Sequence, residues 1–215
     1  MTISYPRDFP EADVKAVQCN FDYAPLGEIS RTAAGAVTFQ ERMGGSLWQL
    51  SLTTVPLNET NYGKWHAWFL SLRGGSGSRS FYGRDPRRCY PIAYGAALST
   101  TFPGFTGACT VTAVTGETIA LGGLPAGYQM RVGDYVSFNW LGGRALVKAL
   151  EDATANGSGV ISSVTVGPWQ RTGGIVPATA TVVKAWCLMR PVPGSWRGER
   201  AGLAPVSFDA IQTLV

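Results

Sequence analysis

The sequence predicts a mainly β fold, in which a β-sandwich with one packed helix carries a small inserted β-barrel or β-sandwich. Three observations predict this class. The 215 residues include 27 glycines and 13 prolines and only 15% charged residues, which is typical of short elements joined by tight turns. Apolar and polar residues alternate in many short runs. A single segment has the periodicity of a helix.

The first predicted strands lie near the N-terminus. Residues 37–42 form one, and the next contains Trp48, Leu50 and Leu52 in alternation with polar residues. This period of two is the clearest β signal in the chain. Residues 1–20 are interrupted by prolines and mixed in polarity, so we expect an extended arm that needs a neighbour to order it.

Residues 57–72 change to a helical period. Four apolar residues fall on one helical face: Tyr62, Trp65, Phe69 and Leu72. Asn58 or Thr60 can cap the start of this helix. Because burying such rings removes a large apolar area from water, we expect the helix to pack across a sheet.

The second half of the chain predicts a series of short strands separated by turn residues. They are residues 80–83, 110–114, 118–121, 134–138, 145–150 and 160–166. The apolar run over 180–189 predicts one long strand that crosses between sheets. Residues 206–215 are predicted to close the sheet as a strand or to form a last helical turn. We expect residues 1–95 and 180–215 to form one domain around an insertion at 96–179.

The basic residues offer one candidate interface. The net charge is only +4, and the densest cluster of bases is the set Arg73, Arg79, Arg84, Arg87 and Arg88. These arginines are interleaved with glycines, serines and aromatic residues, so they could face phosphate, an acidic partner surface or solvent. They are the predicted subunit or partner contact.

Metal and cofactor chemistry has no motif here. Cys19, Cys89, Cys109 and Cys187 are far apart, without the spacing of a zinc ribbon or redox pair, and we expect buried free thiols. His66 is the sole histidine, which excludes a site of several histidines. We expect it to be a helix side chain at the edge of the core, and we expect no metal and no cofactor.

The sequence also predicts no enzyme. The adjacent pair Glu151 and Asp152 is more simply a solvated turn than an acid–base pair. The glycine-rich residues 74–78 lack the lysine and following helix of a phosphate loop. No signal peptide and no apolar run of about 18 residues occurs, so we expect synthesis in the cytoplasm and no membrane partner.

The order of these predicted elements resembles that of a known protein family. Residues 36–88, AVTFQERMGGSLWQLSLTTVPLNETNYGKWHAWFLSLRGGSGSRSFYGRDPRR, resemble the opening domain of tail-tip proteins of long-tailed bacteriophages. A strand with a bulky aromatic residue leads there into a helix rich in aromatic residues, and an aromatic strand then ends in an Asp-Pro turn. The second half is similar at MRVGDYV (130–136), GRALVKAL (143–150), ATANGSGVISSVTVGP (153–168) and MRPVPGSWRGERAG (189–202). The chain most resembles the distal tail protein of siphovirus-like phages.

This resemblance implies a structural role at the tip of a virion tail. It implies a β-sandwich belt domain with a helix that assembles as a ring of six copies between the tail tube protein and the baseplate hub protein. Nucleic acid would be present only as DNA passing through the ring's lumen. Residues 96–179 would be an extra β domain facing outward, shorter than a full carbohydrate-binding module.

Two hypotheses from different classes follow. In the first, the protein is a structural ring whose edge strands and N-terminal arm contact the next subunit, and whose arginines line the lumen or meet an acidic neighbour. In the alternative, it is a carbohydrate-binding module that attaches the particle to its host through exposed rings at Tyr128, Trp140 or Trp169. A peptidoglycan-cleaving enzyme ranks below both, because no local motif brings together an acid, a base and a nucleophile.

Overall fold

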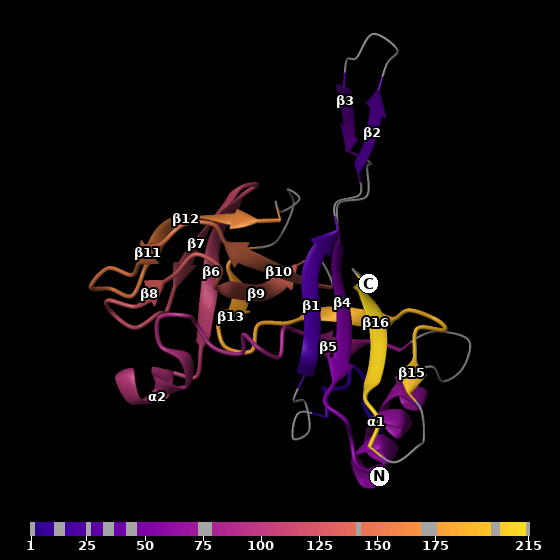
Figure 1. The fold of residues 1–215 in the computed structure, drawn as a ribbon. Helices are drawn as coiled ribbons and strands as arrows, with labels where there is room; N and C mark the ends of the chain where they lie inside the picture. The colour runs from indigo at the N-terminus through magenta and orange to yellow at the C-terminus, as the bar shows by residue number, and fades with distance from the viewer. Residues whose placement is uncertain are drawn as a thin grey trace.

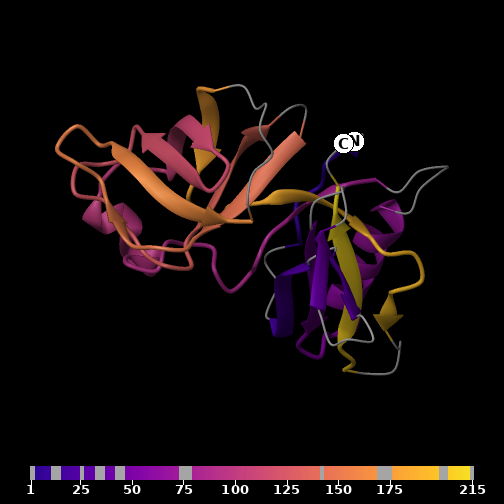
Figure 2. The same ribbon diagram turned by 90° about the horizontal axis from the view of Figure 1, so that it is seen from above.

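The computed structural model describes residues 3–10, 16–24, 27–31, 37–41, 47–72, 79–140, 143–168, 176–198 and 203–213. It confirms the mainly β fold class, with a packed helix and a closed barrel. Apart from the pair β2 and β3, the described strands gather into two units that lie side by side (Figures 1 and 2). We call them the sheet unit and the barrel unit, and each has its own hydrophobic core.

The sheet unit is an antiparallel sheet of six strands with one helix, α1 (Glu59–Leu72), and residues 3–10. Its strands are β1 (Ala16–Ala24), β4 (Leu47–Thr54), β5 (Phe81–Gly83), β14 (Cys187–Pro191), β15 (Arg197–Gly198) and β16 (Val206–Gln212). The order across the sheet is β1-β4-β16-β14-β5, and β15 pairs with β16 beside this path. The C-terminal segment is therefore a strand in the middle of the sheet, and it is not a helical turn.

Helix α1 forms where the helical period predicts it. Its start is capped by Asn58, whose Oδ1 accepts a hydrogen bond of 2.9 Å from the backbone N–H of Asn61. Trp65, Phe69 and Leu72 of the predicted stripe are buried, and Tyr62 is half-buried. Trp68 is buried as well, so the apolar face is wider than the predicted stripe.

The two faces of the sheet differ in polarity. Along β4, Trp48, Leu50, Leu52 and Thr54 are buried, whereas Gln49 and Ser51 between them are exposed. In place of a second sheet, helix α1 covers one end of the apolar face and the barrel unit covers the other. The ring of Trp68 lies 5.7 Å from that of Phe208 of β16, and the ring of Tyr135 from the barrel lies 5.8 Å from that of Trp48.

The barrel unit is built around a closed six-stranded barrel in the order β10-β12-β7-β6-β13-β9. Its strands are β6 (Ala108–Thr115), β7 (Thr118–Gly122), β9 (Tyr135–Trp140), β10 (Gly143–Ala149), β12 (Ile161–Gly167) and β13 (Ala178–Thr181). Beside the barrel lie the pair β8 (Gln129–Met130) and β11 (Ala153–Thr154) and the helical turns η2 (Gly95–Ala97) and α2 (Leu98–Thr101). Strands β6 to β12 fall inside the predicted insertion of 96–179, and β13 straddles its end; the boundaries stay a prediction.

Most of the barrel core is aliphatic. Val111, Leu121, Val136, Val147 and Val164 have no exposed surface or almost none. Tyr128 adds an aromatic ring to this core, next to rings of the segment around α2. Along β6 the buried Cys109 and Val111 alternate with more exposed residues, as the period of two predicts. In β9 and β10 several consecutive residues are buried, because Tyr135 and Leu146 pack against the core of the sheet unit while Val136 and Val147 face the barrel core.

The prediction of one long strand over 180–189 is wrong in its continuity. The segment splits into β13 of the barrel and β14 of the sheet, joined by residues 182–186, so the crossing between sheets is present. The break occurs because Lys184 has a φ of +47°, outside the extended region. The backbone N–H of Lys184 donates a hydrogen bond of 2.6 Å to the carbonyl of Cys89 instead of to a neighbouring strand.

Candidate functional site

A projecting hairpin is the most distinctive surface feature. Strands β2 (Gly27–Arg31) and β3 (Val37–Glu41) pair with each other, Ile29 opposite Phe39, and within the described chain they pair with no other strand. They continue β1 and β4 well beyond the body of the sheet unit (Figure 1). An isolated two-stranded hairpin is at best marginally stable in water. This hairpin, which we call the arm, is therefore a candidate contact surface.

The sheet offers an open edge beside the arm. Among the described strands, β1 pairs with β4 only and ends the strand order of the sheet. Gln18, Asn20 and Asp22 of this strand are exposed. An unpaired edge of this kind can accept a strand from another chain, since its backbone N–H and C=O groups are available for a ladder.

The predicted arginine cluster does not form one exposed patch. Arg73 lies outside the described residues. Arg84 is buried, with 6% of its surface exposed, so the expectation of a solvated or exposed interface residue is wrong for it. Arg79 is exposed and places its guanidinium carbon 4.2 Å from the ring centre of Tyr5. Arg87 and Arg88 are exposed on the turn after β5. Arg79, Arg87 and Arg88 keep the surface position that a partner contact requires.

The described part of the predicted N-terminal extension, residues 3–10 and 16–20, packs on its own chain, contrary to expectation. The Tyr5 hydroxyl donates to the carbonyl of Ser71 at 2.9 Å, and the Trp68 Nε1 donates to the carbonyl of Asp8 at 2.8 Å. Phe9 is buried beside the ring of Trp68, with 5.7 Å between ring centres. Residues 3–10 are thus part of the sheet unit, and β1 begins inside the stretch predicted to be an arm.

The three residues predicted as sugar contacts differ in their exposure. Tyr128 has no exposed surface, so its prediction as an exposed ring is wrong. Burial raises the pKa of its hydroxyl, which has no hydrogen-bond partner among the described residues. Trp140 is half-buried and packs on Phe138 at 5.9 Å. Trp169 lies outside the described residues.

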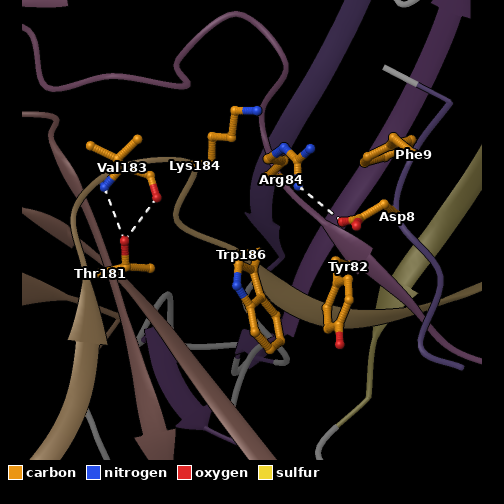
Figure 3. Close-up of a pocket in the computed structure, with 8 residues that line it drawn as sticks. All are labelled: Asp8, Phe9, Tyr82, Arg84, Thr181, Val183, Lys184 and Trp186. Atoms are coloured by element: carbon orange, nitrogen blue, oxygen red, sulfur yellow. Dashed lines mark hydrogen bonds and ion pairs between the residues drawn. The ribbon is translucent and has the colours of Figure 1, made fainter. Parts of the chain in front are cut away.

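An open pocket of about 520 Å³ lies at the junction of the two units (Figure 3). The barrel side contributes Thr181 and Val183, and the sheet unit contributes Asp8, Phe9 and Tyr82. Arg84, Lys184 and Trp186 complete its lining. The described lining residues therefore combine two cationic side chains, one carboxylate and three aromatic rings. We call it the junction pocket.

Charge and ring contacts fix the walls of the junction pocket. The Arg84 guanidinium lies 3.8 Å from the Asp8 carboxylate, which is 70% exposed. The rings of Tyr82 and Trp186 meet edge to face at 4.3 Å. Arg144 of β10 lies over the Trp186 ring at 4.4 Å and donates to Asn139 Oδ1 at 2.7 Å. Burial lowers the pKa of Arg144, because it disfavours the charged form.

Tyr82 and Trp186 were missed by reasoning from the sequence. Trp186 lies in an apolar run that reads as strand interior, and nothing in the sequence places it opposite Tyr82, about a hundred residues earlier. The closed barrel and the turn at Lys184 bring these rings together. The neighbours of Trp186 in the sequence, Lys184 and Ala185, give no indication that its ring lines a pocket.

The two adjacent carboxylates considered from the sequence, Glu151 and Asp152, are both hydrogen-bonded to neighbouring segments. Glu151 accepts hydrogen bonds from the backbone and hydroxyl of Thr165, and Asp152 accepts one from the N–H of Val132 and one from Arg131. These bonds hold the pKa of both carboxyls below its ordinary value. The described residues contain no group of three or more side chains able to hold a metal ion.

The expectation of buried free thiols holds for Cys109 and Cys187, whereas Cys19 and Cys89 are free thiols that are only half-buried. Burial raises the pKa of Cys19 and of Cys109 to about 12. His66 is half-buried and stacks on Tyr62 with 5.8 Å between ring centres, at the edge of the core as expected. Among the described residues, no helix is long and apolar enough to cross a membrane.

The fold class is thus a mainly β protein with a six-stranded sheet, a packed helix and a closed barrel. The chain matches no protein-family model and no curated protein sequence. Its function therefore has to be inferred from its surfaces.

Proposed function

We propose that this protein is a structural ring component of a bacteriophage tail tip, which joins the tail tube to the baseplate hub by self-association. The arm formed by β2 and β3 carries this proposal. A pair of strands that joins no further strand is only marginally stable by itself, so it gains stability when a partner covers it. An element of this kind belongs to a protein that works inside an assembly.

A closed ring needs two different, complementary surfaces on every subunit. The arm is one such surface. The open edge of β1, with Gln18, Asn20 and Asp22 exposed, is a candidate for the other. A strand of the arm could then add to a neighbouring sheet by backbone hydrogen bonds, which demand little of side-chain identity. The resemblance of residues 36–88 to tail-tip proteins supports the same role.

Shortening the arm tests the proposal. Ala24 of β1 lies directly opposite Leu47 of β4, so residues 25–46 can be replaced by Asn-Gly, a two-residue turn suited to antiparallel strands. Light scattering over a concentration series, with negative-stain images, gives the mass of each protein. We expect rings near six subunits for the wild type and monomers for the shortened variant, with the same thermal unfolding of the body.

Gly157→Ala is the matched control, because a methyl group there meets no atom within 4 Å and the residue lies on the barrel unit. It should assemble like the wild type. A wild type that stays monomeric at every concentration, alone and with purified tail tubes, would contradict the proposed function. A shortened variant that still forms rings would show that the arm does not make the contact.

The carbohydrate-binding alternative has little support in the described residues. One of its three rings is buried and one packs on the barrel core. A glycan screen on the same samples covers it: binding to host polysaccharide by monomers, together with a failure to form rings, would replace the structural role by attachment.

A further inference from the structure

We propose that the open edge of β1 receives strand β3 of the arm from a second copy of this chain, and that Asp22 competes for this edge in the free subunit. The inference rests on the proposed function, because the second copy is the next subunit of the ring. Since the arm projects beyond its own sheet unit (Figure 1), it can reach an edge on another subunit. The inference deepens the proposed function by naming the docking strand, the backbone groups that it meets and a residue that controls access to them.

Two hydrogen bonds show which backbone groups of β1 point to the open edge. The backbone N–H of Trp48 in β4 donates to Gln212 Oε1 of β16 at 3.2 Å, so it points away from β1. Tyr23, the residue opposite Trp48, donates its N–H to Oδ1 of its neighbour Asp22 at 2.8 Å. Tyr23 and Trp48 are therefore a non-hydrogen-bonded pair of the antiparallel ladder.

The alternation of an antiparallel ladder extends this result along β1. Phe21 lies opposite Leu50, and Cys19 lies opposite Leu52. Because hydrogen-bonded and non-hydrogen-bonded pairs alternate, Cys19 and Phe21 share the orientation of Tyr23. All three direct their N–H and C=O groups to the side on which no described strand pairs with β1. These groups can form a ladder with one added strand.

The two faces of β1 set the residue pattern of the strand that fits this edge. Phe21 is buried against the ring of Trp48, with 5.1 Å between ring centres, whereas Asn20 and Asp22 are exposed on the polar face. Directly opposed residues of an antiparallel pair share a face of the sheet. The docking strand therefore needs apolar residues opposite Phe21 and Tyr23, and polar residues that are not acidic between them.

Strand β3 has this pattern, and β2 does not. In β3 (residues 37–41, VTFQE) the first and third residues are apolar, and the second and fourth are polar and uncharged. In β2 (residues 27–31, GEISR) a register that places Ile29 on the apolar side places Glu28 on the polar side with Asp22, where two acids repel each other. The valine, threonine and phenylalanine of β3 also favour an extended strand more than the glycine of β2 does.

Asp22 competes with the docking strand for one backbone donor. Its carboxylate accepts the Tyr23 N–H, which would otherwise be available to a carbonyl of the docking strand. The bond lies at the exposed surface, where water can replace it, so a docking strand displaces it at small cost. Charged residues on edge strands limit unspecific pairing with other chains. Asp22 therefore protects the edge until a strand with several matching groups arrives.

Two peptides test the choice of strand. Residues 36–42 (AVTFQER) contain β3, and residues 26–32 (LGEISRT) contain β2; each peptide has one acid and one base, so the two have the same net charge. Surface plasmon resonance measures their binding to the full-length protein, immobilised at a density too low for copies to meet. We expect the β3 peptide to bind about tenfold more tightly than the β2 peptide, because only its pattern matches both faces.

Methylation of single peptide nitrogens tests the ladder itself. Residues that lie opposite Phe21 and Tyr23 donate their N–H groups to the edge, and by the pattern above Phe39 is one of them. A methyl group on the Phe39 nitrogen should weaken binding about tenfold, because it removes a donor and is directed against β1. The same group on the Thr38 nitrogen is directed away from β1 and should change the affinity less than about twofold.

Asp22→Ala gives a change of the opposite sign. Removing the competing carboxylate frees the Tyr23 N–H, so the β3 peptide should bind about threefold more tightly. Glu117→Ala is the matched control, because it removes an exposed acid from the barrel unit and should leave the affinity unchanged. Thermal unfolding of both variants identifies loss of fold, and the methylated peptides keep the test decisive if Asp22→Ala unfolds.

Several results would overturn the assignment. These are equal binding of the two peptides, equal effects of the two methyl groups, or no gain in affinity for a folded Asp22→Ala protein. Light scattering of the full-length protein separates this inference from the proposed function. Rings together with an absence of peptide binding contradict only the edge, and peptide binding by a chain that never forms rings contradicts only the ring.

Discussion

The barrel unit and the sheet unit differ in how completely their strands satisfy one another. The barrel closes on itself, so every strand of it has a neighbour on both sides. The sheet unit ends in the open strand β1, presents a polar face along Gln49 and Ser51, and extends into the arm. Closure removes edges that could pair with other chains. The sheet unit is therefore the half of the molecule from which assembly contacts are expected to come.

The two cores differ in composition as well. The barrel core consists mainly of valine, isoleucine, leucine and alanine, whereas the sheet unit is packed with aromatic rings on α1, β5 and β16. Phe208 lies within about 6 Å of Trp65, Trp68 and Phe69, measured between ring centres at 6.1, 5.7 and 5.9 Å. Large rings let one helix cover one end of a sheet face that a sandwich would cover with strands.

A matched pair of substitutions gives the largest expected effect. Phe208 of β16 and Phe138 of β9 are both buried to within 1% of full burial, and phenylalanine to alanine in such a core costs about 3 to 5 kcal/mol of unfolding free energy. We expect Phe208→Ala to lose hydrogen-exchange protection in β4 and β16, and Phe138→Ala in the barrel strands. Mass spectrometry after exchange measures both.

The pair also tests whether the units are energetically distinct. Loss of protection confined to the substituted unit would sharpen the comparison. Equal loss in both units for either substitution would mean that the junction couples them into one cooperative structure, and the comparison would then describe only geometry.

A smaller effect is expected at one tight turn of the barrel unit. Gly159 has a φ of +72°, and a Cβ there would lie 1.9 Å from the Leu124 carbonyl oxygen. Gly159→Ala should cost at least about 2 kcal/mol, because it combines backbone strain with a steric overlap against backbone. Chemical denaturation measures the loss, with Gly157→Ala as the control that should change little. A loss that spread to α1 and β16 would break the separation of the units.

The smallest effect is expected at the junction itself. The Trp48 Nε1 of the sheet unit donates a hydrogen bond of 2.8 Å to the carbonyl of Leu146 in the barrel. Trp48→Phe keeps a ring in the core but removes this bond, at a cost of about 1 kcal/mol. Denaturation midpoints of Trp48→Phe and of Trp140→Phe on the barrel rim should differ accordingly. Identical midpoints would show that this bond adds no stability to the junction.

Secondary structure was predicted correctly from the sequence where the spacing of apolar residues alone indicates the element. Alternation around Trp48, Leu50 and Leu52 predicted β4, and the spacing of Trp65, Phe69 and Leu72 predicted α1. Strand β1 was missed, because its residues 16–20 follow a stretch rich in prolines and charges. The run over 180–189 was predicted as one strand, since neither Val183 nor Lys184 signals a left-handed turn.

The sequence by itself determined the mainly β class, the helix and most of the strands, because hydrophobic period and turn residues act over a few neighbouring residues. Tertiary structure alone decided that Tyr128 is buried, that Arg84 leaves the exposed arginine cluster, and that Tyr82 meets Trp186. Each of these depends on contacts between segments far apart in the chain. Closure of the barrel and the register of the sheet set such contacts, and no local pattern of residues encodes them.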